Sequence, residues 1–117
     1  MPRAAVPVTA LAIGILGAGG ASAANLAAGK ATYELWCAGC HAAHGTPGRP
    51  EPAGTAILQI RYQGKVPAVL TDRTDLTAAY IALMVRHGRN AMPFFRKTEI
   101  TDAQLRDLAA WLTRARR

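Results

Sequence analysis

The sequence predicts a small all-α protein that forms a single domain. Two segments in its second half carry the start signals of α-helices, and no segment shows the sustained apolar–polar alternation that indicates a β-strand. No internal repeat is visible in the 117 residues, and nothing suggests a second domain. A chain of this length is near the lower limit for a core made of protein alone, so we expect a bound group to fill part of the interior.

The first 23 residues have the pattern of a secretory signal peptide. Arg3 supplies a positive charge, an Ala/Gly/Ile/Leu stretch follows over residues 10–20, and Ala21-Ser22-Ala23 supplies the small residues of a cleavage site. The apolar stretch is shorter than the roughly 20 residues that span a bilayer, so a permanent anchor is disfavoured. We therefore expect cleavage after Ala23, export to the periplasm and a mature domain of residues 24–117.

The chain is basic, with fourteen Lys and Arg against seven Asp and Glu. The basic residues are scattered, and only Arg114, Arg116 and Arg117 cluster, where they suit the C-terminus of a helix. Because a nucleic-acid-binding protein would show a basic stripe or patch, no nucleic-acid partner is predicted. The positive charge would instead attract an acidic protein partner, and no stable membrane insertion is expected.

The first half of the domain contains one predicted helix and one predicted loop. The helix should run from about Leu26 through His41. Residues 42–54 contain glycine or proline at six positions, which excludes both helix and strand. Residues 56–62 would form one or two helical turns ended by Gly64, before the chain becomes extended.

Two helices are predicted in the second half. Leu76 and Ile81 flank Thr77 as a hydrophobic staple around an N-cap, and this helix should continue through Val85 and stop at Gly88. The last helix begins with a capping box and a second staple, formed by Thr101 with Gln104 and by Ile100 with Leu105. Its apolar face, widened by Trp111, consists of Leu105, Leu108, Ala109 and Leu112.

The pentapeptide Cys37-Ala38-Gly39-Cys40-His41 has the spacing of a c-type haem attachment site. Two thiols on one helical turn can add to the two vinyl groups of haem, and the adjacent imidazole can bind the iron. A zinc site would need further ligands at similar spacing, but the chain has only two cysteines. A redox dithiol would need a βαβ context that the flanking sequence lacks. We therefore predict one covalent haem c, attached to Cys37 and Cys40 and ligated by His41.

The sixth position of the iron decides between electron transfer and catalysis. Met92 is favoured as the second metal ligand, because it follows the helix stop at Gly88 and precedes Pro93, which stiffens the loop. Met84, within a helix, suits core packing better. The alternatives to Met92 are an open position, Met84, His87 and His44, of which His44 is too close to His41 in sequence to reach the opposite face.

Ligation by His41 and Met92 would leave no position for oxygen or peroxide and would favour the ferrous state, so it predicts an electron carrier. The other ring nitrogen of His41 needs an acceptor, for which we predict a carbonyl in residues 47–52, with Pro52 preferred. The side chains of Trp36, Arg61 and Tyr62 are candidate partners of a haem propionate.

Several features together resemble the class I cytochromes c. The resemblance covers nearly the whole predicted mature chain, and it implies a small helical fold wrapped around one covalently attached haem. The residues that carry it are Gly29-Lys30 with Tyr33, the motif at residues 37–41, Met92-Pro93 and Trp111.

The resemblance also implies that the first and last helices cross, with Gly29 and Tyr33 packed against Leu108 and Trp111. In one respect the chain departs from the family. The usual Gly-Pro approach to the haem histidine is not cleanly matched by residues 48–52.

Two stretches, residues 73–77 and 92–100, resemble a narrower group: the small cytochrome subunits of flavocytochromes that oxidise 4-alkylphenols, of the p-cresol methylhydroxylase and eugenol hydroxylase type. This implies a partner subunit that carries FAD and oxidises the phenol, while the present chain is a non-catalytic electron-transfer subunit. Electrons would leave to a soluble acceptor such as a copper protein or another cytochrome. The aromatic and basic run Phe94-Phe95-Arg96-Lys97 is a candidate docking surface.

Two alternatives to the subunit of such a complex remain open at the level of sequence. The second hypothesis is a freely diffusing periplasmic monohaem carrier. A haem sensor or peroxidase with a labile sixth ligand is the third hypothesis.

Overall fold

The computed structural model describes residues 1, 22–43 and 47–114. Within these residues it contains helices and turns but no extended strand, and the all-α prediction is confirmed. The predicted signal peptide falls almost entirely outside the described residues, as does His44. The elements in chain order are α1 (Leu26–Trp36), α2 (Ala38–His41), α3 (Ala53–Tyr62), the 3₁₀ turn η1 (Leu70–Asp72), α4 (Ala78–His87) and α5 (Asp102–Thr113).

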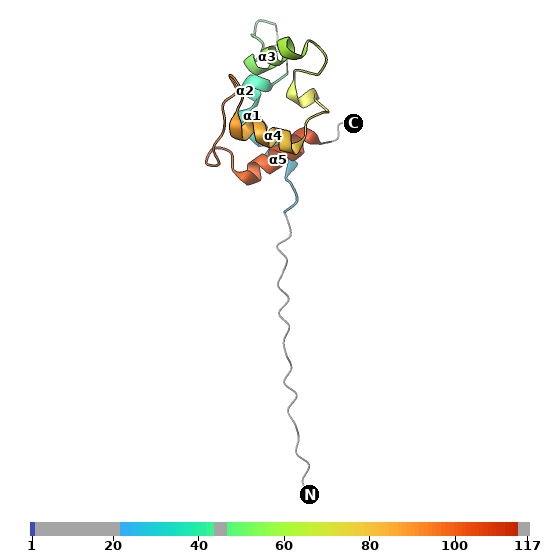
Figure 1. Cartoon of the computed structure of the whole chain (residues 1–117), viewed down its shortest axis with the longest axis vertical. Coiled ribbons are helices and arrows are strands. Elements are labelled where there is room, and N and C mark those ends of the chain that lie inside the picture. The colour runs from blue at the N-terminus through green and yellow to red at the C-terminus, as the bar shows by residue number, and fades with distance from the viewer. Residues whose placement is uncertain (2–21, 44–46, 115–117) are drawn as a thin grey trace.

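The helices form two groups that face each other across the domain (Figure 1). α5 packs against both α1 and α4, and these three helices form one group. α3 packs against α2 and lies at the opposite end of the domain. The chain between α3 and α4, which includes η1, connects the two groups. This arrangement places the motif of residues 37–41 between the helical core and α3.

The crossing of α1 and α5 is the tightest contact in the core. A Cβ atom at Gly29 would lie 2.8 Å from the Cβ of Trp111 and would overlap the backbone carbonyl of Asp107. One turn further along α1, the ring of Tyr33 packs on that of Trp111, with centroids 4.9 Å apart. Leu108 is 1% exposed in the same cluster. The predicted crossing of the first and last helices is therefore confirmed.

The capping signals of α4 and α5 are confirmed. Thr77 caps α4 by accepting a hydrogen bond from the N–H of Tyr80, and α4 ends at His87 with Gly88 as its C-cap. Thr101 and Gln104 form the predicted capping box. The staple residues Ile100 and Leu105 of α5, like Leu76 and Ile81 of α4, are all buried in one core cluster.

The predicted first helix is interrupted at Cys37, contrary to expectation. α1 ends at Trp36, and α2 resumes at Ala38. At Cys37 φ is −114°, and its carbonyl accepts bonds from the N–H groups of both Cys40 (3.1 Å) and His41 (2.9 Å). The bond from Cys40 spans three residues instead of four, so the motif forms a tightened turn rather than a continuation of α1.

The predicted loop of residues 42–54 ends earlier than expected, because α3 begins at Ala53 and has ten residues. Gly54, which the sequence places in the loop, lies in the first turn of α3, where it is in close contact with α2. The helix ends with Gln63 in a left-handed conformation (φ 50°), followed by the predicted Gly64 (φ 78°).

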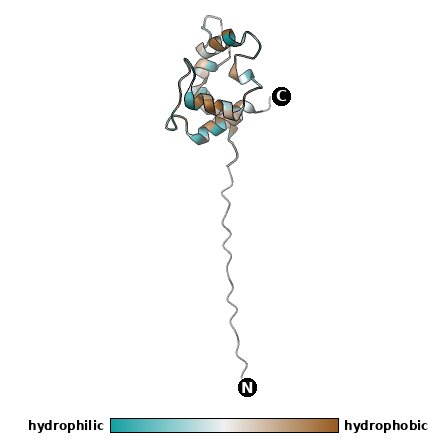
Figure 2. Ribbon diagram, viewed as in Figure 1, coloured by the Kyte–Doolittle hydropathy of each residue, from teal (hydrophilic) through white to brown (hydrophobic). Residues whose placement is uncertain are grey.

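α3 and α4 both contain hydrophobic segments, drawn in brown in Figure 2, and some of the large apolar and aromatic side chains on these helices are exposed. On α3, Ile57 and Ile60 are exposed, and on α4, Tyr80 and Leu83 are. Ile57 and Tyr80 also line the central cavity described below. Part of the rim of that cavity is therefore apolar.

Replacing Gly29 with Ala should destabilise the protein by about 1–3 kcal/mol, because the new methyl group overlaps backbone atoms of α5 that cannot rotate away. Urea unfolding monitored by circular dichroism measures the loss. Gly39→Ala is the matched control, since a Cβ at Gly39 meets no atom within 4 Å. Equal stability of the two variants would contradict the proposed packing.

Candidate functional site

A cavity of about 270 Å³ lies between the α2–α3 side of the domain and α4, α5 and the loop that follows α4. Its volume is close to the lower end of the roughly 300–1,000 Å³ found for cofactor sites, and most of its lining is apolar. Cys37, Cys40 and His41 line it from the α2 side, and Met92 lines it from the loop after α4. The four residues predicted to hold the haem thus come together around one cavity.

His41 lines the cavity with its Nδ1 atom buried and without a hydrogen-bond partner among the described residues. The predicted acceptor was wrong: the carbonyl of Pro52 makes no hydrogen bond to Nδ1 and instead accepts the N–H of Ala56 (2.9 Å) within α3. Burial lowers the pKa of His41 and so favours the neutral imidazole, which is the form that binds a metal. Since Nδ1 is enclosed, Nε2 is the nitrogen available to an iron.

Cys37 does not have the properties of a reactive thiol. Cys37 and Cys40 are not joined by a disulfide. Burial, with a smaller contribution from Cys40, raises the pKa of Cys37 to about 11. A catalytic thiol needs a lowered pKa, so the redox-dithiol hypothesis is disfavoured. Within residues 22–43 and 47–114, no three His, Cys, Asp or Glu side chains are grouped so as to hold a metal ion by themselves.

The loop that carries Met92 folds back onto the end of α4. Arg89 and Met92 exchange two backbone hydrogen bonds of 3.0 Å, and Asn90 between them is left-handed (φ 54°). Gly88 also has a positive φ (63°), and a Cβ there would lie 2.5 Å from the carbonyl oxygen of Met92. A side chain at Gly88 would therefore displace Met92.

A second set of contacts holds the same loop further along the chain. The N–H of Phe95 donates to the carbonyl of Val85 (2.7 Å), and the guanidinium of Arg86 donates to the carbonyl of Phe95 (3.1 Å). Arg86 also pairs with Asp102 at the start of α5 (2.9 Å). Met92 is thus presented from a segment fixed to α4 at both ends.

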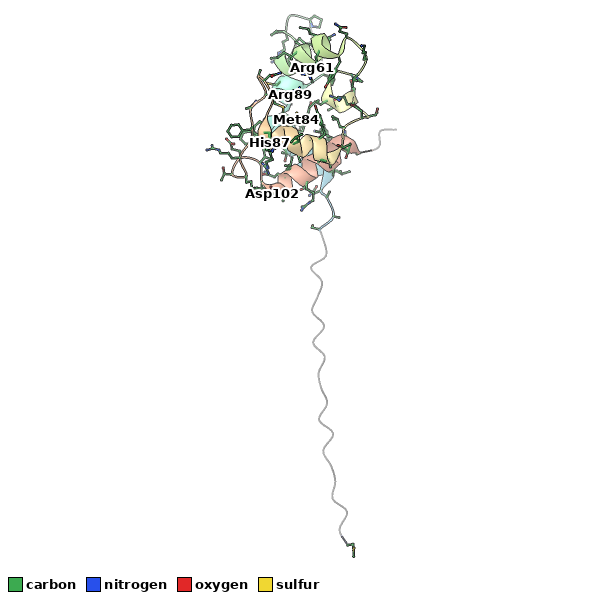
Figure 3. All side chains as sticks on the ribbon, viewed as in Figure 1. Arg61, Met84, His87, Arg89 and Asp102 are labelled. Carbon is green, nitrogen blue, oxygen red and sulfur yellow. The ribbon has the colours of Figure 1, made fainter. Side chains whose placement is uncertain are left out.

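The alternative sixth ligands are placed differently. Met84 is half-buried on α4 and lines the same cavity, whereas His87 is exposed and does not line it. Figure 3 shows Met84 and His87 on α4, with Arg61 toward the α3 end of the domain and Asp102 at the opposite end. Geometry therefore leaves two methionines at the cavity.

Comparison with known proteins identifies the family. Residues 24–112 match the family model described as cytochrome C oxidase, cbb3-type, subunit III. The chain is also 30% identical over 90 residues to a protein named cytochrome c6 from Cyanidioschyzon merolae, and the match covers 77% of this chain and 74% of that protein. The chain belongs to the class I cytochromes c. It therefore carries one covalently bound haem c and transfers electrons.

Arg73 is a residue of this cytochrome's cavity that sequence analysis did not identify as part of the site. It is 7% exposed and lines the cavity beside Tyr62. Its Nε and one terminal nitrogen donate to Asp75 at 2.9 and 2.5 Å, and its other terminal nitrogen donates to the Tyr62 hydroxyl at 3.3 Å. A guanidinium has five N–H groups, so two remain for an anion. The sequence spacing alone does not show that Arg73 is buried while its partner Asp75 is exposed.

The three residues suggested as propionate partners, Trp36, Arg61 and Tyr62, all line the cavity of this cytochrome. Trp36 also meets Phe95 edge to face, with ring centroids 5.7 Å apart. Arg73 adds a buried cation to this set. The cavity therefore offers both an apolar interior and cationic groups suited to the carboxylates of haem.

Among the helices of the described residues, none combines the length and the apolar character that a membrane-spanning helix needs.

Replacing Asp75 with Asn should destabilise the cytochrome by about 1 kcal/mol at neutral pH, because Arg73 loses its charged partner. The hydrogen bond from Arg73 lowers the pKa of Asp75, so the stabilisation is present above the unfolded pKa of about 4. It is lost as the pH falls through the lower folded value.

Guanidinium unfolding at several pH values measures this effect. The gap between the native protein and Asp75→Asn should shrink in acid. Glu34→Gln, which removes an exposed pair with Lys30, serves as the control and should change stability by less than about 0.5 kcal/mol. A gap that does not depend on pH would refute the ion-pair explanation.

Proposed function

We propose that this cytochrome relays single electrons through a haem c that is tethered by Cys37 and Cys40 and ligated by His41 and Met92. The observation that carries the proposal is that all four side chains line one cavity, with the motif and the methionine on different elements. Bound there, the haem would supply the reversible one-electron change of its iron. The chain's part is to hold two ligands and keep water away.

A soft thioether ligand favours the ferrous iron, and a filled coordination shell leaves no position for a substrate. The rigid attachment of residues 88–95 to α4 supports this proposal over a sensor or peroxidase with a labile ligand. Because the loop is held by Gly88, Arg86 and the backbone of Val85, it does not readily move Met92 out of the cavity. No proton transfer is needed, since one electron enters and the same electron leaves.

We further propose that the electron donor is a flavoprotein subunit of the type that oxidises 4-alkylphenols. That subunit would remove a hydride from the phenol onto FAD and pass the two electrons on singly. Support comes from residues 73–77 and 92–100, which carry the resemblance, and from apolar surface near the cavity. Phe94 is 62% exposed, and Trp36 at the cavity wall is 38% exposed.

The basic residues of the candidate docking surface, Arg96 and Lys97, offer less unpaired positive charge than the sequence indicates. Arg96 pairs with Glu99 (3.3 Å), and Lys97 pairs with Asp102 (2.8 Å). By contrast, Arg61 and Arg89 line the cavity and make no ion pair within the described part of the chain. A partner with acidic groups would meet positive charge at these two residues.

A freely diffusing carrier is the second candidate function. The same two cations favour brief encounters with a soluble acidic acceptor, such as a copper protein or another cytochrome. In either case we propose that the mature protein works in the periplasm, on the basis of the export pattern in residues 1–23.

Replacing Met92 with Ala should open one coordination position, which allows carbon monoxide to bind the ferrous protein without denaturant and lowers the reduction potential. Absorption spectra and a redox titration of the haem-loaded variant measure both effects. Met84→Ala is the matched control, because it removes a methionine from the same cavity. The ligand assignment fails if Met84→Ala, and not Met92→Ala, produces the open site.

A stable complex with a flavoprotein should appear in size-exclusion chromatography of protein prepared from its native host. Haem and flavin absorbance are expected to elute together at a mass well above that of this chain. A stable subunit interface buries more than the roughly 1,200 Å² of a transient redox encounter. A single haem peak at about 10 kDa would exclude the subunit and favour the free carrier.

A further inference from the structure

The segment that contains the proposed histidine ligand ends in three consecutive carbonyl groups, those of Cys40, His41 and Ala42. They lie at the end of α2, where the last carbonyls of a helix lack partners inside the helix. Here all three accept hydrogen bonds from side-chain hydroxyls on other helices. Two hydroxyl groups, those of Tyr33 and Thr55, supply these bonds.

Tyr33 reaches this segment from α1. Its hydroxyl donates to the carbonyl oxygen of His41 at 2.7 Å. The residue is 5% exposed, and its ring rests on Trp111 of α5. The position of this hydroxyl is therefore set by the crossing of α1 and α5.

Thr55 reaches the same segment from α3, on the other side. Its hydroxyl lies 2.8 Å from the carbonyl oxygen of Ala42 and 3.4 Å from that of Cys40. A hydroxyl has one proton, so the shorter contact is the main bond and the longer one a weak share. Thr55 is fully buried, with 0% exposure. The two carbonyls on either side of His41 are thus held by one side chain.

Gly54 allows Thr55 to make these contacts. A Cβ at Gly54 would lie 2.6 Å from the carbonyl oxygen of Cys40 and 2.7 Å from Cε1 of His41. Only glycine allows α3 to approach α2 so closely, and this approach brings Thr55 within reach. The same contact covers the imidazole beside its Nδ1 atom, which has no hydrogen-bond partner among the described residues.

We propose that the hydroxyls of Tyr33 and Thr55 are the positioning groups that orient the His41 imidazole, acting through the backbone in place of a hydrogen bond to its ring. A ring whose Nδ1 has no acceptor can turn about its side-chain bonds unless its surroundings hold it. The backbone of residues 40–42 is held from two helices, and Gly54 covers the ring on one side. This inference rests on the proposed ligand role of His41.

The test uses variants that remove a hydroxyl and keep the shape of the side chain. Tyr33→Phe keeps the ring on Trp111, and Thr55→Val keeps the branched side chain. In the ferric haem-loaded protein, the proton NMR shifts of the haem methyl groups report the orientation of the axial ligands. We expect both variants to change the pattern of these shifts. We also expect a change in the equilibrium constant for reduction of up to about tenfold.

Two further variants separate positioning from simple stability. Thr55→Ser keeps the hydroxyl and should return the haem methyl pattern toward that of the native protein. Thr32→Val removes another buried threonine hydroxyl, one that bonds to Ala28 within α1 at 2.9 Å, and should lower stability without changing the pattern. Tyr33→Phe tests the proposal independently if Thr55→Val does not accumulate.

The outcomes discriminate between the inference and the proposed function. Haem methyl shifts that are unchanged in Tyr33→Phe and Thr55→Val would overturn the positioning role, even if both variants are less stable. A change of equal size in Thr32→Val would overturn it as well. If the native protein shows no haem resonances at all, the proposed function fails together with this inference.

Discussion

The contact between α1 and α5 at Gly29 is the constraint on which the rest of the structure depends. Because no side chain separates the two helices there, the ring of Tyr33 reaches Trp111, and both helix faces become part of one core. That placement brings the hydroxyl of Tyr33 to the carbonyl of His41. The packing of α1 on α5 therefore helps to set the position of His41, which lines the cavity.

The two sides of the cavity are held by different means. On the histidine side, short α2 is fixed by hydroxyls from α1 and α3, which partner carbonyls that a longer helix would satisfy itself. On the methionine side, residues 88–95 are fixed by backbone bonds to α4 and by Arg86. A carrier benefits from such rigidity, because ligands that keep their positions in both oxidation states need little rearrangement when an electron arrives.

The charges of the molecule are also divided. Arg96 and Lys97 on the loop after Met92 are paired with neighbouring carboxylates, whereas Arg61 and Arg89 at the cavity make no ion pair among the described residues and remain available to an anionic group or partner. Asp102 accepts hydrogen bonds from both Lys97 of that loop and Arg86 of α4, and these bonds lower its pKa. A formal charge count over the sequence does not reveal this division, because it depends on which side chains meet in space.

The sequence by itself determined the features that arise from local chemistry. Caps at Thr77 and Thr101, the stop at Gly88 and the motif at residues 37–41 involve neighbours within four or five positions, so their spacing predicts them. The tertiary structure alone decided the rest. Gly54 lies in the first turn of α3 instead of in the loop. The carbonyl of Pro52 does not accept a hydrogen bond from His41, and Arg73 becomes part of the cavity. Each of these outcomes depends on contacts between segments far apart in the chain, which set a residue's role only once the helices have packed.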